Sequence, residues 1–265
     1  GPLGWAARRT CLRIGLPYTT SYHTRFPEYV RMRLPLPLRL SYSVMRRFHN
    51  RGQCIMVSSS QLKQEMEQKG FHNVSLWSRG VDTELFKPAE GEINQRERPY
   101  FTYLGRVAPE KNLDAFLDLD LPGPKMVIGD GPLLEILKGR YPKTRFTGFK
   151  KGRELVELLN QSRVFVFPSL TDTLGVVQLE AMACGLPVAA FPVDGPKSLI
   201  INGHNGWMHD DLKQAVVNCL DIDGQQCRAF AMQFTWEACT DQFVSNLCFE
   251  AFEFTSAGHL FAEAA

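Results

Sequence analysis

Residues 164–190 read VFVFPSLTDTLGVVQLEAMACGLPVAA and indicate the class of fold. It begins with an apolar run of valine and phenylalanine over 164–167, which predicts a short buried strand. A helical pattern follows over 175–184, and a second apolar run begins at Val188. A strand, a helix and a strand in this order are the repeating unit of a parallel sheet with crossover connections. We therefore expect an α/β fold.

The same alternation continues on both sides of this stretch. Apolar or β-branched runs predict strands at 100–104, 126–128, 145–147, 164–167 and 188–191. Helical patterns predict helices at 111–117, 133–138, 152–160, 175–184, 212–219 and 225–233. A last helix is expected to begin near Thr235, because a threonine hydroxyl is a suitable N-cap. The sequence thus predicts a Rossmann-like parallel-sheet domain over 100–235, with a C-terminal helix and tail over 236–265.

Residues 1–86 have a less regular α/β pattern. Short strands are predicted there at 16–21, 54–58 and 74–77, and helices at 38–48 and 60–69. The polar stretch 87–99, with two prolines, one glycine and many charges, predicts a linker. An open α/β domain normally begins with a buried strand and a glycine-bearing turn. Because residues 1–86 do not begin in this way, we expect an incomplete N-terminal α/β domain.

Composition narrows the class of protein. The chain has 265 residues, of which 44% are hydrophobic and 22% charged, so it can form a sizeable core. No apolar stretch approaches the roughly 20 residues that a membrane-spanning helix needs. Seven scattered cysteines, none in a Cys-x-x-Cys pair, argue against a disulfide framework or a zinc site. A reducing, cytoplasmic location fits best.

Positive charge is concentrated at the start of the chain. Residues 1–51 contain ten arginines and a single acidic residue, Glu28, which gives this segment a net charge of +9. Such a segment suits an anionic membrane surface or a phosphate-bearing ligand, and equally a merely solvated face. No nucleic-acid-binding module accompanies the arginines, so nucleic acid is not an expected partner. The alternative of peripheral contact with the inner face of a membrane stays open.

The residues after the first strand of the C-terminal domain read GRVAPEKN, 105–112. Gly105 allows a sharp turn, and Arg106 and Lys111 place two cations before the next helix. An arginine offers a planar fork for phosphate oxygens, and a lysine adds a compact charge. These residues predict a phosphate site at the carboxyl end of the sheet. The alternative is a pair of surface cations with Glu110 as local partner.

A second strand end carries two acids. Asp172 precedes the predicted helix 175–184 and Glu180 lies inside it, while Gly175 allows close approach of a ligand to the backbone. A carboxylate near a helix N-terminus stays ionised and accepts hydrogen bonds from sugar hydroxyls. The apolar run after Glu180 predicts a buried helix, so this acid should need a partner. The alternative readings are an N-cap for Asp172 and a surface position for Glu180.

A third strand end reads VIGDGP, 127–132. It contains Gly129 but does not complete the Gly-x-Gly-x-x-Gly fingerprint of dinucleotide-binding proteins. A phosphate-binding loop of the Gly-x-x-x-x-Gly-Lys type is also absent from the sequence. A nicotinamide-dependent dehydrogenase and an ATPase are therefore disfavoured.

Taken in order along the chain, several motifs resemble one known family. They are SYHTRFPEY (21–29), WSRGVDTELFKP (77–88), GRVAPEKN (105–112), VIGDGP (127–132), FTGFKKGRELVELLNQSRVFVFPS (146–169) and TDTLGVVQLEAMACGLPVAA (171–190). Together these motifs resemble the retaining GT-B glycosyltransferases of family 4. Asp172 and Glu180 are separated by seven residues, which is the spacing of that family's donor-site signature. Within that family, the motifs are similar to those of bacterial lipid mannosyl- and sulfoquinovosyltransferases.

The resemblance implies a role for each site residue. Arg106 and Lys111 would hold the donor diphosphate, Glu180 the ribose, and Asp172 the transferred sugar. The amides of 174–176 would meet sugar or phosphate oxygens, and the backbone at 149–150 would receive the base. The further donor-binding residues implied are Gly105, Gly129, Phe149, Lys150, Thr173, Leu174, Gly175 and Val176.

The resemblance also assigns His23, in Tyr22-His23-Thr24, to a position beside the transferred sugar. A lone histidine after a strand is otherwise more often structural. The implied catalytic residues are His23, Arg106, Lys111 and Asp172, and the implied mechanism needs neither a metal nor another cofactor. The expected reaction is the retaining transfer of a hexose, mannose from GDP-mannose as first choice, to a lipid or glycan hydroxyl.

The sequence departs from the family pattern in three respects. The first signature acid is Asp172 where glutamate is commoner, and Pro196-Lys197-Ser198 stands where many relatives have an acid. The initial strands of the N-terminal domain, which closes over the donor and holds the acceptor, are not found. The alternative function is therefore a catalytically weak or inactive sugar-nucleotide-binding fragment.

Overall fold

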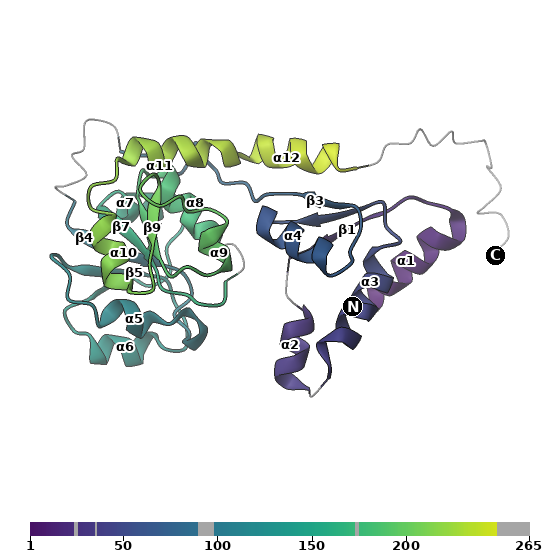
Figure 1. The fold of residues 1–265 in the computed structure, drawn as a ribbon. Coiled ribbons are helices and arrows are strands. Elements are labelled where there is room, and N and C mark those ends of the chain that lie inside the picture. The colour runs from purple at the N-terminus through teal and green to yellow at the C-terminus, as the bar shows by residue number, and fades with distance from the viewer. Residues whose placement is uncertain (24–25, 35, 90–97, 173–174, 248–265) are drawn as a thin grey trace, which may run out of the picture.

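The computed structural model describes residues 1–23, 26–34, 36–89, 98–172 and 175–247. They form two lobes, each built on one parallel sheet (Figure 1). The N-terminal lobe contains the elements from α1 to β3, and the C-terminal lobe those from β4 to η3. The α/β prediction is confirmed in both lobes. The linker predicted over 87–99 lies partly outside the described residues.

The C-terminal lobe has a six-stranded, entirely parallel sheet. Its strands are β4 (Tyr100–Leu104), β5 (Lys125–Ile128), β6 (Arg145–Phe146), β7 (Ser162–Phe167), β8 (Val188–Ala190) and β9 (Gly206–Met208). Five of the six strands were predicted. The sixth, β9, was missed because its short Gly-Trp-Met sequence has no apolar or alternating pattern.

The order of strands in this sheet is β6-β5-β4-β7-β8-β9. From β4 the chain moves outward to β5 and β6, then returns so that β7 pairs with the other edge of β4. Phe101 lies opposite Val164 in this central pair, and Thr102 opposite Phe165. The direction of winding therefore reverses between β4 and β7. In open α/β sheets such a reversal leaves a crevice at the carboxyl ends of the strands, where ligands bind.

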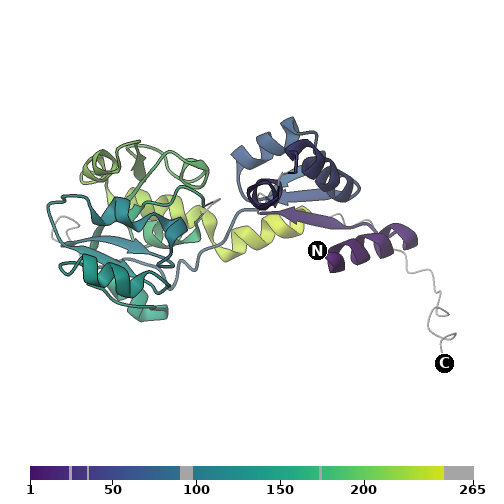
Figure 2. The same cartoon turned by 90° about the horizontal axis from the view of Figure 1, so that it is seen from below.

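Helices flank the six-stranded sheet on both sides (Figures 1 and 2). They are α5 (Leu113–Leu117), α6 (Leu134–Arg140), α7 (Gly152–Leu159), α8 (Val176–Ala183), α9 (Asp194–Lys197), α10 (Leu212–Asn218) and α11 (Gly224–Ala231), with 3-10 turns η2 (Pro109–Lys111) and η3 (Met232–Phe234). Because both faces of the sheet are covered, strand residues such as Met126, Val164 and Phe165 are fully buried. The continuous apolar runs of these strands reflect that burial.

The helix predicted over 111–117 is instead two elements. Asn112 has a left-handed backbone with φ of 54°, which ends η2 before α5 begins. Asparagine tolerates this conformation better than most residues. The break separates Lys111, the last residue of η2, from α5.

The N-terminal lobe is thinner. Its elements are α1 (Pro2–Ile14), β1 (Thr19–Tyr22), α2 (Phe26–Arg33), α3 (Leu38–His49), β2 (Cys54–Val57), α4 (Ser60–Gln68) and β3 (Val74–Leu76). The three strands form one parallel sheet in the order β1-β2-β3. The first strand begins at Thr19 rather than at residue 16, because Gly15, with φ of 70°, ends α1 and Pro17 follows. Ser59 caps α4, its hydroxyl accepting from Leu62 N at 3.2 Å.

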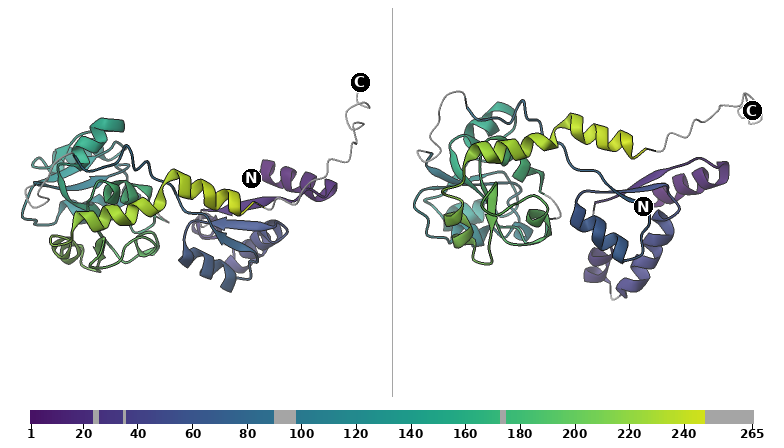
Figure 3. Two further views of the ribbon diagram at one scale, coloured as in Figure 1. Left: turned by 90° about the horizontal axis from the view of Figure 1, so that it is seen from above. Right: turned by 45° about the horizontal axis from the view of Figure 1, so that its top comes forward.

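The last described helix, α12 (Trp236–Ser245), returns from the C-terminal lobe to the N-terminal lobe (Figure 3). The Thr235 hydroxyl accepts from Ala238 N at 3.1 Å, which confirms the predicted cap. The side chain of Gln242 accepts from Ser78 N at 2.8 Å, and the ring of Phe243 lies 5.1 Å from that of Trp77. The chain therefore connects the two lobes twice, once before β4 and once through α12.

Two further features bear on location. Within the described ranges, every helix is too short or too polar to cross a membrane. The six cysteines that the structure describes are free thiols, of which five are buried.

Candidate functional site

Hydrogen bonds accepted by backbone carbonyl groups fix the loop that follows β4. Gly105 N donates to Ile128 O at 3.0 Å, and the Tyr103 hydroxyl donates to Arg106 O, also at 3.0 Å. Further along, the Asn112 side chain donates to Pro168 O at 3.1 Å, in the segment after β7. The ends of β4 and β7 are thus tied together. Lys111, the residue before Asn112, is held at the point where the sheet reverses.

Lys111 and Asp172 form an ion pair across this reversal. The Lys111 Nζ lies 2.7 Å from Asp172 Oδ1 and 2.8 Å from Oδ2. Both side chains are mostly buried, with 20% and 24% of their surface exposed. An ion pair screened from water in this way is stronger than one on the open surface. Asp172 is therefore a partner of Lys111 across the sheet and does not act as an N-cap in the described residues.

Arg106 lies beside this pair and is more exposed, with 66% of its side chain open to solvent. It forms an ion pair with Glu110, the local partner that the alternative reading of the loop expects. The buried Tyr103 hydroxyl lies near Asp172, Glu110 and Arg106, and burial followed by the charge of Asp172 raises its pKa. Arg106, Lys111 and Asp172 therefore gather around the end of β4.

Glu180 occupies the second turn of α8, a helix that is otherwise largely buried. Burial raises the pKa of its carboxyl group. Among the residues that the structure describes, this carboxyl group has neither a hydrogen bond nor an ion pair. The partner that the sequence predicts for Glu180 is therefore not a side chain of the described residues. A half-buried carboxylate without a protein partner has free capacity to accept hydrogen bonds from a ligand.

Two positions at this edge require glycine because a side chain would not fit there. A Cβ added to Gly129 would lie 1.9 Å from Gly105 O, so the loops after β4 and β5 pack backbone against backbone. Gly175, the N-cap of α8, has φ of 74°, and a Cβ there would lie 2.8 Å from the Phe167 ring. Val176 is half-buried and begins α8. The predicted Thr173 and Leu174 lie outside the described residues.

The loop after β6 carries the other predicted residues. Gly148 O accepts from Gly129 N at 2.9 Å, which joins this loop to the one after β5. Phe149 has 70% of its surface exposed, and the Lys150 Nζ lies 3.3 Å from Glu154 Oε2. The predicted residues on the loops after β6, β5, β4 and β7 thus lie along one edge of the sheet.

In the N-terminal lobe, His23 directly follows β1. Its ring lies 5.4 Å from that of Trp77, which directly follows β3. Burial, followed by the charge of Arg79, lowers the pKa of His23 to about 4, so the imidazole is neutral at physiological pH. Both ring nitrogens are buried without a hydrogen-bond partner in the described part of the chain.

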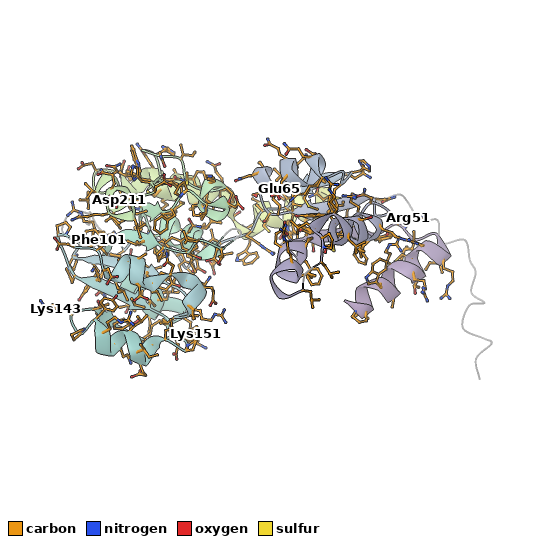
Figure 4. The ribbon with its side chains drawn as sticks, turned by 60° about the horizontal axis from the view of Figure 1, so that its bottom comes forward. Arg51, Glu65, Phe101, Lys143, Lys151 and Asp211 are labelled. Carbon is orange, nitrogen blue, oxygen red and sulfur yellow. The ribbon has the colours of Figure 1, made fainter. Side chains whose placement is uncertain are left out.

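The carboxyl ends of the two sheets face each other. The Gln61 side chain, at the start of α4 beyond β2, donates to Asp194 Oδ1 at 3.2 Å, at the start of α9 beyond β8. His23 therefore lies on the edge of its sheet that faces the edge carrying Lys111 and Asp172. Figure 4 shows the side chains of both lobes, with Glu65 labelled in the N-terminal lobe and Phe101 in the C-terminal lobe.

Sequence reasoning missed three residues of this region. Tyr103 and Asn112 fix the loop that carries Arg106 and Lys111, and Gln61 joins the lobes. A tyrosine in a strand and a polar residue before a helix are too common to be singled out.

The described residues contain no group of three or more His, Cys, Asp or Glu side chains placed to hold a metal ion.

Two family models match the chain. The one described as glycosyl transferases group 1 matches residues 98–221, and the one described as Glycosyltransferase Family 4 matches residues 1–85. The GDP-mannose-dependent alpha-mannosyltransferase of Mycobacterium tuberculosis is 30% identical in an alignment of 215 residues that covers 78% of this chain and 57% of that protein. Sulfoquinovosyl transferase SQD2 of Arabidopsis thaliana is 28% identical over 271 residues, covering 91% and 53% of the two chains. The chain thus spans little more than half the length of these relatives.

Solved structures share the fold. Anabaena Alr3699/HepE, in complex with UDP and glucose, has a TM-score of 0.70 at 18% identity and covers 91% of this chain and 74% of its own. Sucrose-phosphate synthase of Thermosynechococcus elongatus has a TM-score of 0.72 at 20% identity, covering 91% and 70%. The two family models match separate lobes, and the strand ends carry the motifs that suggested the resemblance. The chain belongs to the GT-B glycosyltransferases of family 4.

Proposed function

We propose that this protein binds a nucleoside diphosphate sugar and transfers its hexose, with retention of configuration, to a lipid or glycan hydroxyl. The observation that carries the proposal is the Lys111–Asp172 pair, with Arg106 beside it, at the reversal of the six-stranded sheet. A cation at this crevice suits a diphosphate, and a carboxylate next to it suits the hydroxyls of a sugar. Mannose from GDP-mannose is the first choice, because a relative at 30% identity is named for that donor.

The proposed chemistry depends on where charge develops. When the bond between the sugar C1 and the diphosphate oxygen breaks, negative charge accumulates on the leaving nucleoside diphosphate. In this proposal, Lys111, Arg106 and the first amides of α8 would stabilise that charge. The acceptor hydroxyl forms the new bond to C1 on the face that the diphosphate leaves. Its proton passes to an oxygen of the departing diphosphate, so no protein base is required.

Three other residues would position the donor. Glu180, which has no partner among the described residues, would accept hydrogen bonds from the ribose hydroxyls, and Asp172 from those of the sugar. His23 would face the sugar from the N-terminal lobe. Its pKa of about 4 keeps it neutral, so one ring nitrogen can donate and the other accept. In this proposal the diphosphate is neutralised by side chains, and we expect transfer to continue in the presence of EDTA.

The acceptor side of the proposal rests on the N-terminal lobe. Helix α1 has no buried residue, and Trp5 and Ile14 are exposed among its arginines. Exposed apolar residues next to arginines suit the interface of an anionic membrane. We propose peripheral contact with the cytoplasmic face of such a membrane. Sedimentation with anionic and with neutral vesicles tests this contact, and equal binding to both would count against it.

The alternative function is a sugar-nucleotide-binding fragment with little or no transfer activity. The alignment with the mannosyltransferase relative covers 57% of that protein, so transfer by the whole relative is not carried over to this chain without a test. Both functions predict donor binding, and only the first predicts a product. Transfer of labelled mannose from GDP-mannose to a lipid extract by the purified chain separates them.

The first experiment is thermal unfolding with GDP, UDP, ADP and NAD. A ligand present at about 100 times its dissociation constant adds about 2.7 kcal/mol to the free energy of unfolding. We expect GDP or UDP to stabilise the protein and NAD to have no effect. Stabilisation by NAD alone would instead favour a dehydrogenase.

A further inference from the structure

An acidic side chain of the protein itself, Asp172, contacts the cation that is proposed to bind the diphosphate. Both oxygens of Asp172 lie within 2.8 Å of Lys111 Nζ. In the described part of the chain, Asp172 is the one hydrogen-bonding partner of that ammonium group. A phosphate oxygen that approached Lys111 would meet a carboxylate already in contact and would be repelled by its charge.

We propose that the donor enters by exchange: the diphosphate displaces Asp172 from Lys111, and the released carboxylate takes up hydroxyls of the donor sugar. Asp172 then determines specificity for the sugar nucleotide over the bare nucleoside diphosphate. This inference rests on the proposed function, because it requires a diphosphate ligand at Lys111.

Discrimination between the sugar nucleotide and the bare nucleoside diphosphate depends on the hydrogen bonds that each ligand offers to Asp172. Removing an ion-pair partner from a mostly buried carboxylate is costly unless new hydrogen bonds replace it. The transferred sugar of a sugar nucleotide carries hydroxyls that can replace it, whereas the only sugar hydroxyls of a bare nucleoside diphosphate are those of the ribose, which the proposed function assigns to Glu180. The nearby Tyr103 hydroxyl donates its single proton to Arg106 O at 3.0 Å, so it is already committed. The bare diphosphate, which is also the reaction product, should therefore bind less well than its charge alone would allow.

Of the two acidic residues paired with cations at the end of β4, Asp172 and Glu110, Asp172 is the one that competes with the ligand for Lys111. Arg106 already has its own acidic partner, Glu110, at the exposed side of the loop. Glu110 is two-fifths exposed, so water screens its charge far more than that of Asp172. The competition for Lys111 is therefore between Asp172 and the ligand.

The test measures GDP and GDP-mannose binding by calorimetry in Asp172→Asn, with UDP and UDP-glucose as a second ligand pair. The substitution keeps the shape of the side chain and removes the charge that holds Lys111. We expect GDP to bind about tenfold more tightly, equivalent to about 1.4 kcal/mol, while GDP-mannose gains less or loses affinity. Glu135→Gln is the matched control, because Glu135 forms an exposed pair with Lys138 at 2.8 Å and its loss should change neither affinity.

The same substitution made in the Lys111→Met variant distinguishes exchange at Lys111 from simple repulsion between Asp172 and the diphosphate. In Lys111→Met, the further change Asp172→Asn should no longer tighten GDP binding, because no ammonium remains to be released. An equal gain in both backgrounds would overturn the proposal, and so would an unchanged or weaker affinity for GDP in Asp172→Asn. If that variant unfolds, Asp172→Ser and inorganic pyrophosphate as ligand repeat the comparison. Failure of the wild-type chain to bind any of these nucleotides would overturn the proposed function together with the exchange.

Discussion

The two sheets of this molecule consist of the same parallel units but place different chemistry at their carboxyl ends. In the C-terminal lobe the strand order reverses between β4 and β7, and a lysine and an aspartate meet across the reversal. The three strands of the N-terminal lobe follow one another without a reversal and end in a neutral histidine beside a tryptophan. An ion pair therefore lies at the carboxyl end of one sheet, and a neutral imidazole lies at the carboxyl end of the other. Donor binding and acceptor binding should therefore respond to different substitutions.

The largest expected effect concerns the close packing of loops in the C-terminal lobe. A methyl group at Gly129 would lie 1.9 Å from Gly105 O, and the glycine φ of 142° adds backbone strain. We expect Gly129→Ala to lower the free energy of unfolding by about 3–5 kcal/mol and to abolish nucleotide binding. Gly139→Ala in α6 is the control, because a methyl group there meets nothing within 4 Å. Urea unfolding measures both variants, and equal stability of the two would contradict the packing account.

The next effect tests the charged site itself. Lys111→Ala removes the cation at the reversal, and Arg106→Ala removes its exposed neighbour. Each charge-assisted hydrogen bond contributes about 1.5–3 kcal/mol, so we expect each variant to lower the transfer rate or donor affinity by about ten- to a hundredfold. Calorimetry with the donor and product assays measure these losses. Wild-type values in both variants would remove the diphosphate site from the C-terminal lobe.

Acid should destabilise the N-terminal lobe through His49, a buried histidine of α3. Burial lowers the pKa of His49 from 6.5 to about 4. The unfolded chain therefore takes up its proton first as the pH falls from about 6.5 to about 4, and the stability conferred by neutral burial is lost over this window. Between pH 7 and pH 5 we expect a loss of about 1–2 kcal/mol from this group. His49→Gln should unfold in urea with a smaller loss over the same range, and an identical loss would exclude this residue as the cause.

The smallest expected effect is a loss of stability on substitution of Lys69 in the N-terminal lobe, which is compared with substitution of Lys111 in the C-terminal lobe. Lys69 donates to the Tyr42 hydroxyl at 2.7 Å and forms an ion pair with Glu65, which ties α4 to α3. We expect Lys69→Met to lower the free energy of unfolding by about 1 kcal/mol while leaving GDP affinity unchanged. Lys111→Met should show the reverse pattern. A loss of nucleotide affinity in Lys69→Met would break the proposed division between the lobes.

The sequence predicts the strands of the C-terminal sheet well because they are buried on both faces and contain continuous apolar runs. Val164 and Phe165 belong to such a run. The short β9 contains a buried glycine followed by a half-buried tryptophan and methionine, so no periodicity marks it. The start of β1 was placed too early for a related reason, since the residues after α1 are apolar without being part of the sheet.

Motif spacing located the candidate site but not its internal contacts. Arg106, Lys111, Asp172 and Glu180 were all identified from the residues around them. The ion pair of Lys111 with Asp172 joins positions 61 residues apart. It depends on β7 crossing back beside β4, which no local pattern encodes. The absence of a partner for Glu180 among the described residues was likewise beyond local reasoning, because apolar neighbours indicate burial without showing what faces a carboxylate.

The central claim is that the cations at the reversal of the C-terminal sheet bind the diphosphate of a sugar nucleotide. Calorimetric titration of GDP-mannose and UDP-glucose into the wild-type chain and into Lys111→Met tests it most directly. The account predicts saturable one-to-one binding of at least one of these nucleotides to the wild type, and binding at least tenfold weaker to the variant. Equal affinity in the two proteins, or no binding to the wild type, would contradict it.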